Sequence, residues 1–360
     1  MASARRLIGI LRKWLWLLRS DWRHNRRRAR AASFILVVRD LDRLFDYQEF
    51  YLRWLRENLP EAASRIRLAR LGPVSPRVGR AALVVAWLPD SLRDRFPVRY
   101  RWSCRLEARC AARSIPIVNP ASVTSDGVKS ISLPVIAATG IRTARVVPLR
   151  TPEARATLLD RLSPPLFIRE DLTHGGGPHD LIEHPGQLRE VAWHRYQCPV
   201  AVELIDVRSP DGYYRKYRYV LIGERGFPRH LIISRNWFVH AGERIGGQAA
   251  IDEEVAYLEG PDPNHERLDR ARRALGLDLV AFDYSYERDG SLVVWEPNPT
   301  PTLWWRGNEE REDPYDRPYV ERIYEALTRY LFERAGMMEI EMPSPRKQEW
   351  SRRRTAAPGS

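Results

Sequence analysis

Two apolar runs near the end of the chain predict a β-hairpin that carries a row of oxygen-bearing side chains. The runs Leu277–Phe282 and Leu292–Trp295 flank a polar turn that contains glycine, as antiparallel strand pairs do. Their pairing would bring Asp283 beside Glu296, and alternation along a strand puts Asn298 on the same face as Glu296. Two carboxylates and an amide oxygen suit magnesium. The pattern therefore predicts a magnesium site, and the alternative is a hairpin whose acids face water.

The composition favours a globular protein of two or three domains. The chain has 360 residues, and 44% of them are hydrophobic, which is enough to form a sizeable core. Its net charge of +13 is concentrated toward both ends, which indicates an anionic partner surface. The cysteines are odd in number and lack the spacing of a zinc site, so we expect reduced thiols in a cytoplasmic protein at Cys104, Cys110 and Cys198.

Residues 4–30 have the pattern of a basic amphipathic helix. Basic residues occupy one face, and the other face carries, at helical spacing, Leu7, Leu11, Trp14, Leu15, Leu18 and Trp22. Such a helix binds an anionic lipid surface, so we expect peripheral attachment to the inner face of the membrane. The alternative is a helix that packs on the protein's own body. No apolar run reaches the roughly 20 residues that a membrane-spanning helix needs.

Alternating strands and helices predict a small α/β unit after this helix. The strands are expected at Phe34–Val38, Ala82–Leu88 and Ile115–Val118, and the helices at 44–59 and 102–113. Pro60 is expected to end the first of these helices. The order of elements is less regular after residue 118, which is typical of α+β lobes. We therefore expect a basic helical extension at 1–32, the α/β unit at 33–118, a larger domain at 119–335 and a basic, disordered tail at 336–360.

Cations stand at the ends of two predicted strands. Lys216 and Arg218 lie two residues apart at the start of the strand Tyr217–Ile222, so they share one face. Arg235 stands at the end of a second apolar strand, which begins at Ile232. Three cations of this kind can bind a polyphosphate. The alternative is that they are solvated charges at strand ends, as most arginines on strands are.

A glycine run follows a short strand that ends in a cation. The strand is Leu166–Arg169, and the run comprises Gly175, Gly176 and Gly177. Successive glycines allow the backbone to approach a phosphate closely, and they permit a mobile flap. A plain flexible turn is the alternative reading of the run.

A buried strand at Val200–Ile205 leads into Asp206. The edge of such a strand can offer backbone hydrogen bonds to an adenine ring, and Glu203 or Asp206 can accept hydrogen bonds from a ribose. We therefore expect this segment to bind a nucleoside. Together with the cations and the carboxylates, it completes a set of groups suited to a magnesium–nucleotide complex.

The order of these motifs resembles the ATP-grasp superfamily between Asn119 and Leu303. In that family a lysine follows the first turn, a second cation ends the strand before the flap, and a glutamate with two apolar residues forms the hinge strand. The matching residues are Lys129, Arg169, Glu203-Leu204-Ile205, Arg218 with Gly223, Gly246-Gly247 after the strand of Arg235, and the trio Asp283, Glu296 and Asn298. Arg169 stands where the family usually has lysine, which keeps the charge and changes the donor geometry.

The resemblance implies an α+β fold in which two lobes grip ATP, of the type found in glutathione synthetase and related carboxylate-amine and carboxylate-thiol ligases. It implies an ATP- and magnesium-dependent ligase that activates a carboxylate as an acyl phosphate and joins it to an amine or similar nucleophile. Two Mg2+ ions are expected, and Mn2+ can replace them. The alternatives are a kinase with the same nucleotide site, or a non-catalytic nucleotide-binding protein at a membrane surface.

The resemblance also implies roles for individual residues. Lys129 and Arg169 would hold the α- and β-phosphates together with Lys216, and Arg218 and Arg235 would stabilise charge during phosphoryl transfer. The substrates would be a small-molecule or peptide carboxylate and an amine, and no nucleic acid is expected. The family places acceptor contacts at positions matched by His174, His240, Trp304 and Trp305, although a loop histidine or an aromatic anchor for the last helix explains each equally well.

Overall fold

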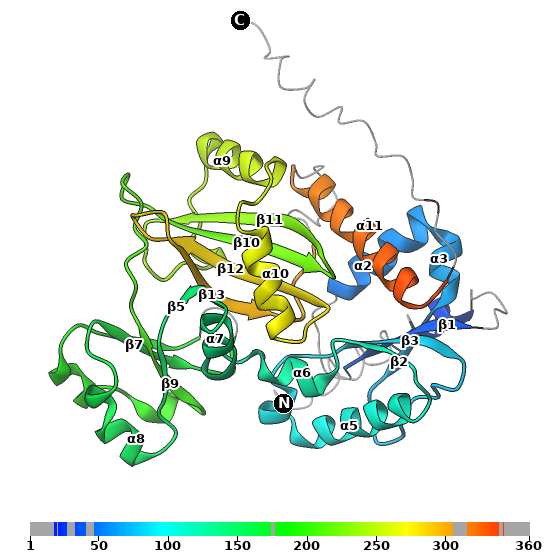
Figure 1. Ribbon diagram of the computed structural model, residues 1–360, viewed down its shortest axis with the longest axis horizontal. Coiled ribbons are helices and arrows are strands. Elements are labelled where there is room, and N and C mark those ends of the chain that lie inside the picture. The colour runs from blue at the N-terminus through cyan, green and yellow to red at the C-terminus, as the bar shows by residue number, and fades with distance from the viewer. Residues whose placement is uncertain are drawn as a thin grey trace, which may run out of the picture.

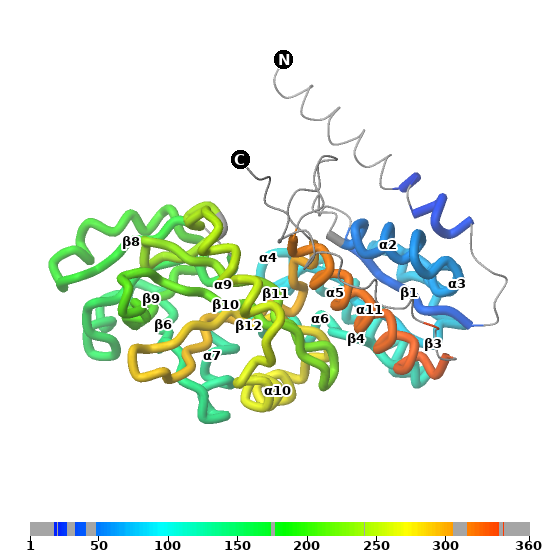
Figure 2. The backbone as a smooth tube through the Cα atoms, turned by 90° about the horizontal axis from the view of Figure 1, so that it is seen from above, coloured from blue at the N-terminus to red at the C-terminus, as the bar shows by residue number. Residues whose placement is uncertain are grey.

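The computed structural model describes residues 18–19, 21–26, 33–40, 47–173, 177–304, 315–337 and 341. These residues form three β-sheets that lie in a row, with helices packed around them (Figures 1 and 2). Within the described ranges, no helix is both long enough and apolar enough to cross a bilayer. The parallel first sheet and the two largely antiparallel sheets make the α+β architecture that the sequence predicts.

The first sheet has the order β2-β1-β3-β4, and all its strands are parallel. Its strands are β1 (Phe34–Arg39), β2 (Ile66–Arg70), β3 (Ala81–Trp87) and β4 (Ile117–Val118), and its helices are α2 (Tyr47–Asn58), α3 (Pro60–Arg65), α4 (Leu92–Arg95) and α5 (Pro97–Ala111). The sequence analysis missed β2, because only Ile66 and Leu68 alternate inward over its short length. Pro60 begins α3 as well as following α2, as proline can at the first turn of a helix.

The second sheet is the small antiparallel lobe on the left of Figure 1. Its order is β6-β9-β7-β8, with α8 (Pro152–Ala156) beside it. The strands are β6 (Val146–Pro148), β7 (Leu166–Glu170), β8 (His179–Ile182) and β9 (Pro199–Glu203). Leu166, Ile168 and Ala201 point into one apolar cluster, whereas Phe167, Val200 and Val202 point to the opposite face, toward the third sheet.

The third sheet lies between the other two and has the order β11-β10-β12-β13-β5. Its strands are β5 (Arg142–Thr143), β10 (Tyr214–Ile222), β11 (Arg225–Ser234), β12 (Leu279–Tyr286) and β13 (Leu292–Asn298). The helices around it are α6 (Ala121–Thr124), α7 (Lys129–Ala137), α9 (Gln248–Glu259), α10 (His265–Ala274) and α11 (Arg317–Arg334).

The register of this sheet confirms the predicted pairing of the two carboxylates. Asp283 on β12 lies opposite Glu296 on β13, and Ala281 lies opposite Asn298. The predicted end of the first strand at Phe282 is wrong, because β12 continues through Asp283 to Tyr286. Asp283 therefore stands in the interior of a strand, where neighbours on both sides hold it in place.

Helix α11 joins the first sheet to the third. Its buried residues share one apolar cluster with α2, β1 and the deep ends of β10 and β12, and Figure 1 shows α11 beside α2. Tyr51 of α2 hydrogen-bonds Thr328 of α11 at 2.9 Å, and Trp54 packs on Tyr324 with ring centroids 5.5 Å apart. This shared core fixes the first sheet to the sheet that carries the carboxylates.

Candidate nucleotide site

A cavity lies between the second and third sheets, where the predicted phosphate and metal residues converge. Its walls come from β7, β9, β10, β12, β13 and the first turns of α7. Its charged lining comprises Lys129, Arg169, Lys216, Asp283 and Glu296. Five of the residues that the sequence singled out thus meet in one place although they are spread over 168 positions of the chain, from 129 to 296.

Asp283 is almost fully buried and is held by two cations of β10. Arg218 lies opposite it in the register and donates two hydrogen bonds to its carboxylate, at 2.5 and 2.8 Å. Lys216, two residues earlier on the same face, has its ammonium 3.6 Å from the same carboxylate. Burial lowers the pKa of Arg218, but the charge of Asp283 outweighs this effect, so that the pKa rises. The Arg218 guanidinium is therefore charged at neutral pH.

Lys129 and Arg169 form a second, buried cationic pair. Lys129 begins α7, is 3% exposed and forms an ion pair with Glu296. Burial and then the nearby charge of Arg169 lower the pKa of Lys129, and burial lowers that of Arg169. The buried Nε of Arg169 has no hydrogen-bond partner among the described residues. Two cations so close together, with one donor unused, favour an anion between them.

The donor set around Asp283 and Glu296 fits a hard cation. The carboxylates are register partners, and Asn298 follows on the same strand face with its amide nitrogen turned to the Ala281 carbonyl at 3.4 Å. Within the described residues no group of three or more His, Cys, Asp or Glu side chains is arranged to hold a metal. The set here is smaller, with two carboxylates and one amide oxygen. It would leave coordination positions for water and phosphate oxygens, as Mg2+ prefers.

Aromatic side chains fill the apolar part of the cavity. Trp237 and Phe238, in the loop after β11, pack on Phe167 with ring centroids 5.2 and 6.4 Å away. Phe238 also stacks on His179, 3.9 Å away, and lies 5.8 Å from the guanidinium of Arg169. The remaining cavity has a volume of about 110 Å3. Small-molecule sites usually enclose roughly 300–1,000 Å3, so a nucleotide requires this loop or the lobes to move.

The structure separates the predicted nucleoside residues. Leu204 and Ile205 line the cavity just after β9. The Glu203 carboxylate instead accepts hydrogen bonds from the Arg142 side chain at 2.8 Å and the Arg145 amide at 2.9 Å. Burial raises the pKa of Glu203, but these bonds outweigh it and lower the pKa overall. Asp206 is exposed, and its carboxylate caps the backbone amide of Arg208 at 3.0 Å.

One glycine of the run lies within the described residues. Gly175 and Gly176 lie outside the described residues, as does His174. Gly177 is described, and its carbonyl lies 3.2 Å from Nδ1 of His179. Because His179 also stacks on Phe238, the end of the run is tied to the aromatic wall of the cavity.

Arg235 does not join the other predicted residues. It lies just past the end of β11, is exposed and makes no ion pair with any residue that the structure describes. It lines a second, open cavity of about 730 Å3 together with Arg208, Tyr214 and Asn236. Trp237 lines both cavities, so the second cavity adjoins the first.

The residues noted as possible acceptor contacts have different positions. His240 lines the first cavity, where its Nδ1 accepts a hydrogen bond from the Gly242 amide at 3.1 Å. Trp304 stacks on Phe50 of α2 with ring centroids 6.2 Å apart, a contact with a different helix from the last one. Trp305 lies outside the described residues.

The sequence analysis missed His230 and the aromatic wall. His230 lies opposite Arg218 in the register, so it extends the row formed by Arg218, Asp283 and Glu296 across four strands. Burial and then the charge of Arg218 hold its pKa well below the usual value. Counting back from the turn would have placed Arg229 opposite Arg218, because an irregularity between Arg218 and Tyr219 shifts the partner by one residue to His230.

Comparisons with known proteins identify the architecture. No protein-family model matches the sequence. No curated protein is significantly similar to it in sequence. Among solved structures, the ATP-grasp ligase PsnB, complexed with a phosphomimetic variant of a minimal precursor, Mg and ADP, is 18% identical. The alignment covers 84% of this chain and 98% of that chain, with a TM-score of 0.54.

Two further structures show the same similarity. The VanG D-Ala:D-Ser ligase from Enterococcus faecalis is 12% identical, with a TM-score of 0.56, over 85% of this chain and 100% of that chain. The D-cycloserine synthetase DcsG is 15% identical, with a TM-score of 0.54, over 83% of this chain and 99% of that chain. The chain therefore has the ATP-grasp fold.

Proposed function

We propose that this protein is a magnesium- and ATP-dependent ligase that activates a carboxylate as an acyl phosphate and joins it to an amine or similar nucleophile. The observation that carries the proposal is the convergence of Lys129, Arg169, Asp283 and Glu296 on one cavity between two sheets. The three solved structures compared above are named as two ligases and a synthetase, which supports the same class of chemistry.

The charges around the cavity support a nucleotide ligand. Asp283 neutralises Arg218, and Glu296 neutralises Lys129. A polyphosphate with magnesium brings charges of both signs, so each side chain can exchange its present partner for one on the ligand. Lys129, Arg169 and Lys216 would then contact phosphate oxygens, while Asp283, Glu296 and Asn298 would hold the metal. Bound magnesium would neutralise charge on the β- and γ-phosphates.

The apolar part of the cavity would take the adenine ring. Leu204 and Ile205 lie at its edge, and Phe167 and Val202 offer apolar surface. Glu203 and Asp206 remain candidates for the ribose only after a change of partner, because Arg142 and the Arg208 amide now engage them. Binding also requires Trp237 and Phe238 to move aside. When they return over the bound nucleotide, we expect them to exclude water from the phosphates.

The chain's own groups would align the reactants and stabilise charge, because acyl phosphate formation needs no covalent protein nucleophile. The carboxylate oxygen attacks the γ-phosphorus, ADP leaves, and the nucleophile then displaces phosphate from the acyl carbon. Arg218 is held by Asp283, which lines the cavity, and it would stabilise charge on the transferred group.

The second cavity would take the acceptor substrate. Arg235 and Arg208 give it two cations, of which Arg235 has no described ion-pair partner, and Tyr214 and Trp237 give it aromatic surface. This lining suits a carboxylate on a small molecule or peptide. The second cavity adjoins the first across Trp237, which supports transfer of a phosphoryl group from a nucleotide in the first cavity to a carboxylate in the second.

The test is ADP release with pooled carboxylates and amines, followed by mass spectrometry of the products. A carboxylate labelled with 18O should pass one labelled oxygen to inorganic phosphate, because the acyl phosphate loses that oxygen with the phosphoryl group. A phosphorylated alcohol without a ligated product would indicate the kinase alternative. Nucleotide binding without ADP release from any pool would indicate a non-catalytic protein.

The number and kind of metal ions and the location of the protein complete the proposal. Two magnesium ions are proposed, with manganese able to replace them. Titration of ADP release with each metal measures the number of ions and tests whether manganese replaces magnesium. A cytoplasmic location is proposed because the cysteines are free, with Cys110 buried among apolar residues. Cell fractionation tests the location.

A further inference from the structure

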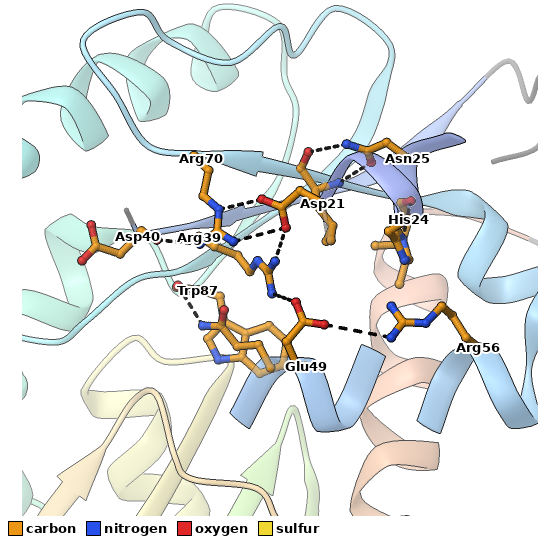
Figure 3. Close-up of polar contacts among 12 residues, drawn as sticks. Asp21, His24, Asn25, Arg39, Asp40, Glu49, Arg56, Arg70 and Trp87 are labelled. Carbon is orange, nitrogen blue, oxygen red and sulfur yellow. Dashed lines mark hydrogen bonds and ion pairs between the residues drawn. The ribbon is translucent and has the colours of Figure 1, made fainter. Parts of the chain in front are cut away.

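The helix before the first sheet is attached to the protein through its polar face. Residues 18–19 and 21–26 are helical, and Figure 3 shows Asp21, His24 and Asn25 directed toward the sheet. Asp21 forms ion pairs with Arg39 of β1 and, at 2.6 Å, with Arg70 of β2. Asp21 and His24 are 6% and 5% exposed.

Asparagine and histidine side chains replace a neighbouring strand along the open edge of β2. The Asn25 side chain accepts a hydrogen bond from the Leu68 amide and donates one to the Leu68 carbonyl, both at 3.0 Å. The His24 Nε2 lies 3.1 Å from the carbonyl of Ile66. Because β2 is the outer strand of its sheet, these contacts satisfy backbone groups that would otherwise face water. The attachment is therefore specific.

A buried arginine adds to this attachment. Arg39 is 1% exposed, and its charge is shared between Asp21 of the helix and, at 2.7 Å, Glu49 of α2. Removing Asp21 would leave this buried cation with only one of its two carboxylate partners, which is strongly unfavourable. The orientation of the helix is thus fixed by a residue in the interior of the protein.

The opposite face of the same helix is apolar and basic, and it is exposed. Leu18 and Trp22 are 47% and 57% exposed, and they lie one turn apart. Arg19, Arg23 and Arg26 are exposed beside them, with the Arg26 guanidinium 4.5 Å from the centroid of the Trp22 ring. An amphipathic helix on a protein surface normally buries its apolar face. Here the polar face is buried, so the apolar face is left for a partner outside the protein.

We infer that this face, comprising Leu18, Arg19, Trp22, Arg23 and Arg26, binds the surface of an anionic phospholipid bilayer. Tryptophan and leucine insert at the boundary of headgroups and acyl chains, and arginines attract acidic headgroups. A second copy of the chain fits less well, because a symmetric contact would bring arginines against arginines. A protein interface also needs about 800 Å2 from each partner, more than two apolar side chains supply.

The proposal is independent of the proposed enzymatic function. Figure 2 shows this helix at the end of the molecule that carries β1 and α2, whereas β8 and β9 lie at the other end. The helix therefore lies far from the second sheet, which forms one wall of the cavity. In the sequence, the same spacing of apolar residues continues toward the N-terminus at Leu7, Leu11, Trp14 and Leu15, and these positions precede the described residues.

The test is co-sedimentation of the full-length chain with vesicles of phosphatidylcholine alone or mixed with phosphatidylserine. The wild type should bind only the anionic vesicles and should be released at high salt. Two variants of the helix should each weaken binding by on the order of 10- to 100-fold. The first is the double variant Leu18→Ser with Trp22→Ser, and the second is the triple variant Arg19→Gln with Arg23→Gln and Arg26→Gln. The matched controls change exposed residues of α5 and should bind as the wild type does. They are the variant Val98→Ser and the triple variant Arg101→Gln with Arg105→Gln and Arg109→Gln.

Thermal denaturation of every variant shows whether it is folded, since exposed side chains contribute little to stability. Equal binding to both kinds of vesicle, no binding by the wild type, or unchanged binding by the helix variants would overturn the proposal. A dimer in size-exclusion chromatography that Leu18→Ser with Trp22→Ser converts to a monomer would show that the face binds a second copy instead. Asp21→Asn should lower the melting temperature and leave vesicle binding intact, which separates attachment to the body from attachment to lipid.

Discussion

Asp283 and Glu296 lie directly opposite each other on β12 and β13, yet each forms its ion pair with a different part of the chain. Asp283 binds Arg218 of the adjacent strand, and Glu296 binds Lys129 of α7. Two adjacent carboxylates repel each other, and the cations on either side offset this repulsion. The pair thus joins the sheet to α7 across the nucleotide cavity.

Replacing Asp283 should destabilise the fold as well as the site. Asp283→Asn leaves Arg218 without its buried counter-charge, so the free energy of unfolding should fall by about 3 kcal/mol. Urea denaturation measures this. Asp283→Asn combined with Arg218→Gln should lose less than the sum of the two single variants. The control Glu253→Gln removes a more exposed partner of Arg215 and should lower the free energy of unfolding by less than about 1 kcal/mol. A loss as large as that of Asp283→Asn would contradict the claim that burial makes the Asp283 ion pair more important for stability.

Arg169 should bind phosphate through both the charge and the shape of its guanidinium. Arg169→Ala removes charge-assisted hydrogen bonds worth about 1.5–3 kcal/mol, so the apparent Kd for ATP should rise roughly 10- to 100-fold. Arg169→Lys keeps the charge, and we expect a smaller increase. Isothermal calorimetry compares the three proteins. Wild-type affinity in both variants would show that Arg169 is a structural charge at the strand end.

Phe238 and His179 should control access to the cavity. Their stacked rings hold the closed arrangement, and an aromatic contact of this kind contributes about 0.5–1.5 kcal/mol. Phe238→Ala should therefore raise the association rate of a fluorescent ATP analogue roughly 2- to 10-fold, in stopped-flow measurements. His179→Ala removes the other ring and should have a similar effect, with little added by combining the two. Slower association in both variants would show that the rings form part of the binding surface instead.

Two histidines, the buried His24 and the half-buried His230, should make the fold sensitive to acid. Burial lowers the pKa of His24, and burial with the nearby Arg218 lowers that of His230 further. The unfolded chain binds these protons below about pH 6.5, whereas the folded chain does not. The stabilisation is therefore complete above pH 6.5 and is lost as the pH falls, by up to about 1.4 kcal/mol per pH unit for each histidine.

The check is the free energy of unfolding between pH 7.5 and 5.5, from urea titrations. His230→Gln and His24→Gln should each flatten this dependence, because glutamine does not titrate in this range. Exposed His194→Gln is the matched control and should leave the slope unchanged. A slope that is identical in all four proteins would mean that neither histidine is the source of the acid sensitivity.

The sequence predicted those parts of the site that lie within one or two strands. Alternation along a hairpin was enough to pair Asp283 with Glu296, and strand-end cations led to Arg169 and Lys216. Lys129, at the start of a helix, came only from the family resemblance. Arg235 could not be assigned to a cavity, because its position depends on how the loop after β11 folds back, and loop conformation has no periodic signal. The same loop supplies Trp237 and Phe238, whose packing on the second sheet is a contact between distant segments.

The N-terminal helix was harder to interpret from its sequence. Its apolar stripe favoured either a membrane or the protein's own body, and the two were treated as alternatives. The structure shows that the described part contacts the body through Asp21, His24 and Asn25, so contact with the body and an exposed apolar face coexist. This arrangement depends on unpaired backbone groups of β2, a strand that the sequence analysis did not predict.

The central claim is that Mg-ATP binds between the second and third sheets through the groups around Asp283 and Glu296. Isothermal calorimetry with Mg-ATP tests it most directly, using wild type, the double variant Asp283→Asn with Glu296→Gln, and Glu224→Gln, an exposed control in the turn after β10. We predict saturable binding to the wild type and the control, and at least roughly 100-fold weaker binding to the double variant, since each buried charge–ligand contact contributes about 1.5–3 kcal/mol. Wild-type protein that binds no nucleotide in the presence of magnesium, or a folded double variant that binds as tightly as the wild type, would contradict the account.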